Sequence, residues 1–251
     1  DGLSASFAQV NAVLEGRYAQ ALGSGAALGE NGQIAVCRPG GDSAGDQALY
    51  EFAPPVYQGT EASCAGTVGI VFIGRQTGEN QDASTLPYGD GTPHMLAPTA
   101  AELATVDYAK RACAAVVVVL ASPSPMETAA WEDDPGVSAI LWLGGAGSTG
   151  YLSLGDILTG RVNPSGRLPD TWAASFKRDP TFPNQDDGSR RFLYENALTT
   201  MVSSGGWRDR ARTPFREYEE GVYLGYRYYE TACQEGALTD FYNRRSGVLY
   251  P

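Results

Sequence analysis

Apolar residues recur at helical spacing near the start of the chain and later gather into short continuous runs. The first pattern predicts an amphipathic helix that ends at Gly23, with an apolar face made of Leu3, Phe7, Val10, Leu14 and Tyr18. The continuous runs predict strands at 68–73, 116–120 and 137–143, and one short apolar piece lies earlier, at 34–37. Strands without polar alternation are typical of a parallel sheet that is buried on both faces.

Helical patterns separate the later strands. Helices are predicted from about 98 to 112 and near 151–158, so strands and helices alternate along this part of the chain. The alternation predicts an α/β fold, a three-layer α/β sandwich with a mainly parallel sheet of about six strands.

The character of the sequence changes beyond Arg161. The composition of residues 163–169 predicts a turn followed by a short strand, and residues 177–214 are polar and loop-like. Residues 218–229 are dense in tyrosine and predict a return to extended structure. We expect these tyrosines to pack at a domain edge or an interface rather than to stack on sugar.

Length and composition set the broad class. The chain has 251 residues, 43% of them hydrophobic, which is enough for one large domain with a sizeable core. We expect a single domain over 1–251, with its core in about 1–172 and an irregular C-terminal extension, including the aromatic strand, in about 173–251. The net charge of -11 argues against nucleic acid or an anionic membrane as the main partner, because both need clustered Lys and Arg.

No apolar run approaches the roughly 20 residues needed to span a bilayer. The chain begins at Asp1, without Met and without a positively charged, apolar leader, which is compatible with a processed or trimmed terminus. The sequence therefore leaves the compartment open between the cytoplasm and secretion.

The cysteines and the histidine give no sign of a metal site. The cysteines are irregularly spaced, without a C-x-x-C pair: Cys37, Cys64, Cys113 and Cys233. His94 is the only histidine, so a structural zinc site of the usual spacing is not expected, and no cofactor is indicated. Cys113 is expected to be a small core residue, and disulfides among the four stay open.

Two motifs suggest other enzyme classes. Residues 41–45 fit the G-x-S-x-G elbow of α/β-hydrolases and resemble its form in hormone-sensitive-lipase-like esterases, but His94 follows Ser43 too closely for that fold. Residues 145–150 form G-x-G-x-x-G, a dinucleotide fingerprint for which Asp170 would be the acidic partner. A turn at 163–169 intervenes, so we expect these glycines to serve a tight turn and close helix packing.

A third motif follows the strand at 68–73. Gly74 and Gly78 flank a loop that holds Glu79 at the carboxyl end of this strand, where open α/β sheets present ligand-binding groups. The alternative is that the glycines only shape a turn and Glu79 is a solvated surface charge.

Several segments together favour the first interpretation. Residues 74–82 resemble the G/S-R-x-S/A-G-E-G-x-D-R loop of glycoside hydrolase family 3, particularly of bacterial β-glucosidases. Further matches keep the family's order at 124–126, 139–142, 155–169 and 218–229. The resemblance covers about 68–229, and its last two blocks are highly specific.

The resemblance implies a six-stranded α/β sandwich that packs against a separate (β/α)8 barrel, in the same full-length protein or a partner chain. The barrel would carry the aspartate nucleophile of a retaining exo-β-glycosidase, and Glu79 would be the general acid/base. Arg75, Asp82 and His94 would border the sugar-binding end of the cleft. The substrate would be a terminal β-linked sugar, a β-glucoside or a related compound.

The chain departs from the family pattern in three ways. Asn80 stands where the family usually has Gly, and Ala83 where it usually has Arg. The barrel and the fibronectin-type-III-like domain of the family have no counterpart here, so the isolated chain is expected to be inactive. The alternative function is a non-catalytic carbohydrate-binding or interaction module that kept the fold.

Overall fold

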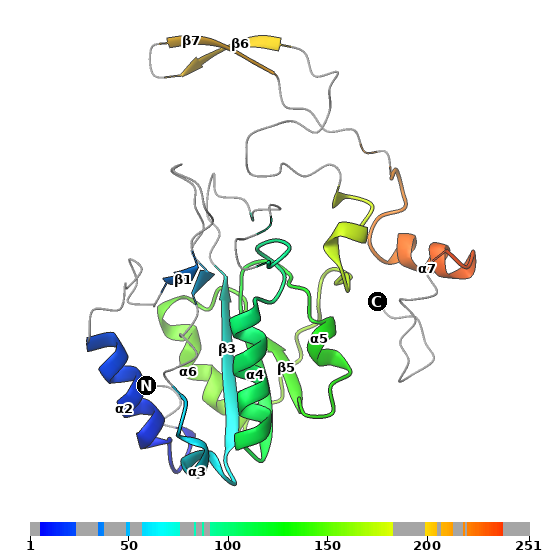
Figure 1. Ribbon diagram of the computed structural model, residues 1–251. Coiled ribbons are helices and arrows are strands. Elements are labelled where there is room, and N and C mark those ends of the chain that lie inside the picture. The colour runs from blue at the N-terminus through cyan, green and yellow to red at the C-terminus, as the bar shows by residue number, and fades with distance from the viewer. Residues whose placement is uncertain are drawn as a thin grey trace. The chain divides into compact units, whose positions relative to one another are not determined.

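The computed structural model describes residues 6–23, 35–37, 49–50, 57–75, 83, 87, 91–182, 199–204, 207–212, 218 and 220–237 (Figure 1). Internal contacts divide the chain into two compact units. The first comprises Asp1–Asp82 and Pro87–Leu168, and the second comprises Ala83–Leu86 and Pro169–Pro251. The boundary at Leu168 lies four residues before the predicted end of the core at about 172.

The first unit is built on one sheet in the order β1-β2-β3-β4-β5. Its parallel part consists of β3 (Val68–Arg75), β4 (Ala115–Ala121) and β5 (Ala139–Trp142). The short strands β1 (Ala35–Cys37) and β2 (Leu49–Tyr50) pair antiparallel beside them. The predicted α/β fold with three neighbouring parallel strands is therefore confirmed, and five strands lie in the described residues where about six were predicted.

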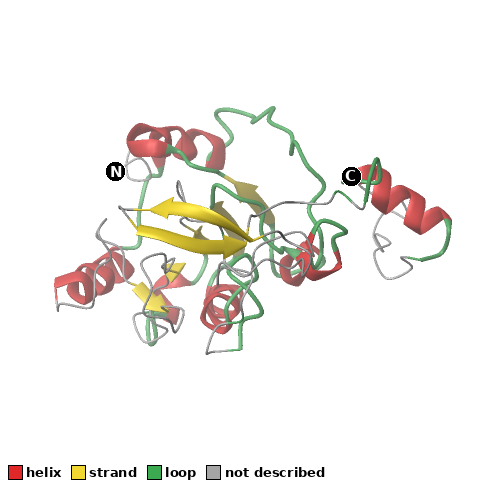
Figure 2. Ribbon diagram, turned by 90° about the horizontal axis from the view of Figure 1, so that it is seen from above, coloured by secondary structure: helices red, strands yellow, loops and turns green. Residues whose placement is uncertain are grey.

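The strand β4, in the middle of the parallel part of the sheet, forms the centre of the core because it is apolar along its whole length. Val118, Val119 and Leu120 have no exposed surface. Helices α4 (Ala100–Ala112) and α6 (Gly147–Leu158) cover opposite faces of the sheet, which gives the three layers (Figures 1 and 2). Burial on both faces explains why β4 shows no polar alternation.

Glycines shape the approach of α4 to β3 and the start of α6. At Gly69 of β3, a Cβ atom would lie 2.9 Å from the Cys113 sulfur and 3.3 Å from the Ala109 Cβ, so only glycine allows this close approach of α4. The G-x-G-x-x-G segment forms the start of α6, with Gly147 at a φ of 60° and the Gly150 amide donating to the Ala146 carbonyl at 3.1 Å. Helix α6 therefore begins about four residues earlier than predicted.

Helix α2 spans Ala12–Gly23 and ends where the sequence predicted, but Phe7 and Val10 precede it. The Asn11 side chain sets its start, because Oδ1 accepts hydrogen bonds from the amides of Val13 and Leu14. No helix in the described ranges combines the length and apolarity that crossing a membrane requires.

A cavity of about 860 Å³ runs along β3. Five consecutive strand residues, 68–72, line it together with residues of α2 and α4. Successive residues of a strand face opposite sides, so the cavity follows the edge of β3 rather than one face.

The second unit contains η2 (Phe176–Arg178), a hairpin of β6 (Thr199–Ser204) and β7 (Trp207–Arg212), and α7 (Tyr226–Gln234). The short strand predicted after 163–169 is absent from the described residues up to 182.

The extended structure predicted for 218–229 is wrong from Tyr226 onward, where α7 begins. Tyr229 and Ala232 are buried at a spacing of three residues, which matches the period of a helix rather than that of a strand. The Tyr229 hydroxyl donates to Asp179 Oδ2 at 2.9 Å, and burial followed by the Asp179 charge raises its pKa. One tyrosine of the segment thus packs inside its own unit, whereas Tyr218 is 75% exposed.

Val118 is buried and Val68 is exposed, and this difference gives a test of the core. Val118→Ala should lower the free energy of unfolding by about 2 kcal/mol or more, because it leaves a cavity in the central strand. Val68→Ala removes the same atoms from a side chain that is 53% exposed and should change stability by less than about 0.5 kcal/mol. Equal losses in urea unfolding of the two variants would contradict the assignment of β4 as the core strand.

Candidate active site

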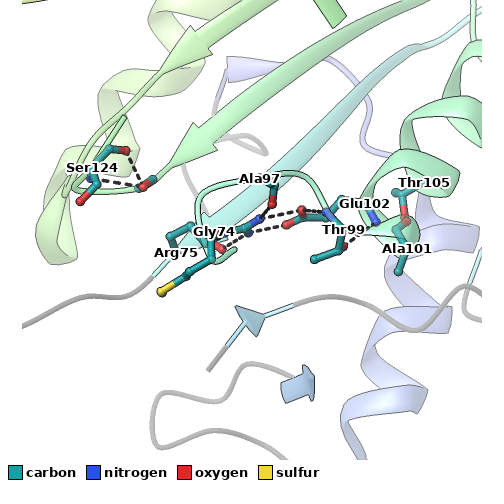
Figure 3. A network of polar contacts seen from close by, with 10 residues as sticks. Gly74, Arg75, Ala97, Thr99, Ala101, Glu102, Thr105 and Ser124 are labelled. Carbon is teal, nitrogen blue, oxygen red and sulfur yellow. Dashed lines mark hydrogen bonds and ion pairs between the residues drawn. The ribbon is translucent and has the colours of Figure 1, made fainter. Parts of the chain in front are cut away.

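Arg75, the last residue of β3, is buried at the edge of the sheet where the strands have their carboxyl ends (Figure 3). Every hydrogen-bond donor of its side chain binds an acceptor of the protein. Nε donates to the Met95 carbonyl at 2.5 Å, and Nη2 donates to the Ala97 carbonyl at 2.9 Å. Nη1 donates to the Gly74 carbonyl at 2.7 Å and to Glu102 Oε1 at 2.5 Å, while Nη2 also reaches Glu102 Oε2 at 2.8 Å. These contacts use all five N–H groups of the guanidinium.

Glu102 binds Arg75 and also forms part of the N-terminal cap of α4. Its Oε2 accepts a hydrogen bond from the Thr99 amide at 2.9 Å, and its own amide donates to Thr99 Oγ1 at 3.1 Å (Figure 3). This capping box satisfies two donors at the helix start. Arg75 and Glu102 are 4% and 5% exposed, so each charge depends on the other for compensation.

The same contacts join two places that are far apart in sequence. Arg75 ends β3, whereas Met95 and Ala97 lie just before α4. The chain between Arg75 and Met95 contains Glu79 and Asp82. The guanidinium therefore fixes both ends of the segment that holds the predicted acid/base residue.

His94 holds the C-terminal end of this segment through a separate contact, with Glu127. It is 2% exposed, and its Nε2 lies 2.9 Å from Glu127 Oε1. The Glu127 amide donates to the Leu96 carbonyl at 2.9 Å. Residues 94–97 are consequently held by β3 through Arg75 and by the chain after β4 through Glu127.

The carboxyl ends of β4 and β5 are linked at the same edge. The Trp142 indole donates to the Ser122 carbonyl at 2.8 Å. The Ser122 hydroxyl donates to the Ser124 carbonyl at 2.7 Å and accepts from the Ser124 amide at 3.2 Å. These hydrogen bonds join the ends of β4 and β5, beside the end of β3. The carboxyl ends of the three adjacent strands form a rim, the kind of position where α/β sheets bind ligands.

The predicted site residues divide into two groups. Arg75 and His94 come together at this rim, joined through residues 94–97. Glu79 and Asp82 lie outside the described residues, so their side chains stay predictions. In the described ranges, no three His, Cys, Asp or Glu side chains come close enough to hold a metal ion.

Two residues of the rim were not predicted from the sequence. The sequence could have indicated Glu102 as a helix-capping residue, because a Thr three residues before a Glu at the start of a helix is a capping-box pattern. No local sequence pattern could have indicated Glu127, because its pairing with His94 depends on the fold.

Residues 53–226 match the sequence model of the glycosyl hydrolase family 3 C-terminal domain. The chain is 28% identical over 193 residues to Probable beta-glucosidase A of Aspergillus fumigatus, covering 77% of this chain and 19% of that protein. It is 29% identical over 184 residues to Beta-glucosidase 1 of Aspergillus aculeatus, covering 73% and 18%. The chain therefore spans about a fifth of the length of these relatives.

A solved β-glucosidase from Paenibacillus barengoltzii has a similar fold. It aligns with a TM-score of 0.62 and 23% identity, covering 94% of this chain and 22% of that one. The similar sequences come from fungi and the similar structure from a bacterium, so the resemblance to bacterial enzymes in particular is not supported.

The buried pair leads to a stability prediction. Glu102→Gln keeps an oxygen for the Thr99 amide but leaves the Arg75 guanidinium buried without a counter-charge. We expect the free energy of unfolding to fall by about 3 kcal/mol, as for other buried pairs that lose one partner.

Glu61→Gln is the matched control. Glu61 also lies in the first turn of a helix, α3 (Glu61–Cys64), but it is exposed. Its substitution should change stability by less than about 0.5 kcal/mol. A loss below about 1 kcal/mol for Glu102→Gln in urea unfolding would contradict the role given to the pair.

Proposed function

The chain belongs to the glycosyl hydrolase family 3 C-terminal domain family, and from this premise we propose that it supplies the general acid/base of a retaining exo-β-glycosidase. Glu79 is the proposed acid/base residue. The substrate class is a terminal β-linked sugar, because the relatives that match most of the chain are named β-glucosidases.

The chemistry requires a second carboxylate from elsewhere. Retaining glycosidases hold two carboxyl groups roughly 5 Å apart, one to attack the anomeric carbon and one to protonate the leaving oxygen. We propose that a (β/α)8 barrel, in the same full-length protein or a partner chain, provides the nucleophile. Glu79 first donates its proton to the departing group and then, as a carboxylate, removes a proton from the attacking water.

The anchoring of the chain around Glu79 is the observation that carries this proposal. Glu79 follows Arg75 by four residues, so its Cα atom lies within about 14 Å of that anchor. Arg75 also holds Met95 and Ala97, where the chain returns toward α4. A catalytic group on a connection between fixed ends, at the carboxyl edge of a parallel sheet, fits the usual design of α/β active sites.

The remaining predicted residues take supporting roles in this proposal. Arg75 is a positioning residue, since all five of its donors bind protein acceptors. Asp82 and His94 are proposed to border the sugar-binding end of the cleft, with His94 oriented by Glu127.

The test compares leaving groups in the intact enzyme. Glu79→Ala should slow hydrolysis of a disaccharide by roughly 10²- to 10⁴-fold, the usual contribution of general acid–base catalysis. An activated aryl β-glucoside should form the glycosyl intermediate at a near-normal rate, because its departure needs little protonation. Azide should then accelerate breakdown of that intermediate, since a small anion attacks without a general base.

Glu61→Ala is the control, because Glu61 is exposed at the start of α3. It should leave both rates unchanged. Equal losses on the two substrates for Glu79→Ala, without azide rescue, would reject Glu79 as the acid/base residue.

The 251-residue chain alone offers a second test. Without a nucleophile, it should show no turnover of the aryl glucoside above background, because loss of one of two cooperating groups removes most of the rate. Addition of the separately prepared barrel should restore turnover if the parts assemble. Turnover by the chain alone would mean that it holds a complete site.

A further inference from the structure

Two cysteines lie where α3 and α4 end, on neighbouring segments. Cys64 is the last residue of α3 and is 1% exposed, whereas Cys113 follows α4 and is partly buried. Thr67 lies between them. Its hydroxyl donates to the Cys64 carbonyl at 2.7 Å and lies 3.9 Å from the Cys113 sulfur.

The backbone holds these segments together beside the two thiols. The Thr67 amide donates to the Cys64 carbonyl at 3.0 Å, and the Thr67 carbonyl accepts from the Ala114 amide at 2.8 Å. The chain just after Cys64 is therefore hydrogen-bonded to the chain just after Cys113.

The Cys64 and Cys113 side chains lie at the same buried cluster. Cys64 belongs to a buried cluster with Tyr57 and Tyr108, and Cys113 packs against this cluster. The Cys113 sulfur lies over Gly69, where a Cβ atom would come within 2.9 Å of it. Burial, and to a smaller extent the neighbouring Cys64, raises the pKa of the Cys113 thiol.

The thiols also have a route for a reagent. Both cysteines line the cavity of about 860 Å³ along β3. Access to the sulfur is one of the conditions for thiol–disulfide exchange, and a cavity lined by both cysteines supplies it.

We propose that Cys64 and Cys113 are a disulfide-forming pair, oxidised by a small disulfide such as glutathione disulfide. The thiolate of one cysteine attacks a sulfur of the oxidant, forms a mixed disulfide and releases one glutathione thiolate. The second cysteine thiolate attacks the protein sulfur of the mixed disulfide and releases the other. Two protein thiols lose two electrons and two protons, and one glutathione disulfide becomes two glutathiones.

The bond would close the chain from Cys64 to Cys113, which contains β3, Glu79 and α4. A closed loop of this length reduces the freedom of the unfolded chain and raises stability. The proposal holds whether or not Glu79 is the acid/base residue, because it depends only on the two thiols.

The test uses the 251-residue chain incubated with glutathione disulfide at about pH 8.5, near the ordinary pKa of a cysteine thiol. Non-reducing peptide mapping of the unsubstituted chain should show the Cys64 peptide joined to the Cys113 peptide. The oxidised chain should melt about 5 °C or more above the reduced chain, as expected for a bond across a long loop.

Cysteine-to-serine variants distinguish a disulfide between Cys64 and Cys113 from other thiol reactions. Cys64→Ser and Cys113→Ser should each abolish the shift in melting temperature, whereas Cys233→Ser should leave it unchanged. Peptide maps in which Cys64 and Cys113 carry only separate glutathione adducts, or pair with Cys37 or Cys233, would overturn the proposal. Because the map is made on the unsubstituted chain, this outcome does not depend on the folding of any variant.

Discussion

The buried ion pair between Arg75 and Glu102 is the constraint on which the described site depends. A guanidinium with so little exposure requires both a counter-charge and acceptors for its other donors. Glu102 provides the charge, and the carbonyls of Met95 and Ala97 provide acceptors. Because Glu102 also caps α4, a single interaction joins the end of β3 to the start of α4.

The strand pattern predicted the sheet well because burial on both faces leaves a direct signal in the sequence. The run of valines in β4 is such a case. The site was less predictable, because Arg75 has the same local sequence whether it faces a sugar or a carboxylate. Apart from the Gly74 carbonyl, its partners come from residues 20 to 27 positions later in the chain, and only the capping-box pattern of Thr99 and Glu102 indicated one of them.

The errors in the helices have a physical cause as well. Apolar residues before Asn11 continue the helical spacing of α2, yet the Asn11 side chain binds the first amides and sets the start of the helix. In the segment at 218–229, the density of tyrosine favoured a strand. The burial of Tyr229 and Ala232 on one helical face decided the structure instead, since β propensity reflects packing more than backbone preference.

β3 and α4 are joined at both ends of their contact. At one end, the Thr67 carbonyl accepts from the amide of Ala114, which follows α4, and Gly69 admits the Cys113 sulfur. At the other end, Arg75 binds Glu102. Strand and helix are therefore held together at both ends, and Arg75 and residues 94–97, the described residues on either side of the chain that contains Glu79, are bonded to each other. The proposed function needs this rigidity, because an error of 1 Å in the placement of a catalytic group costs much of the rate.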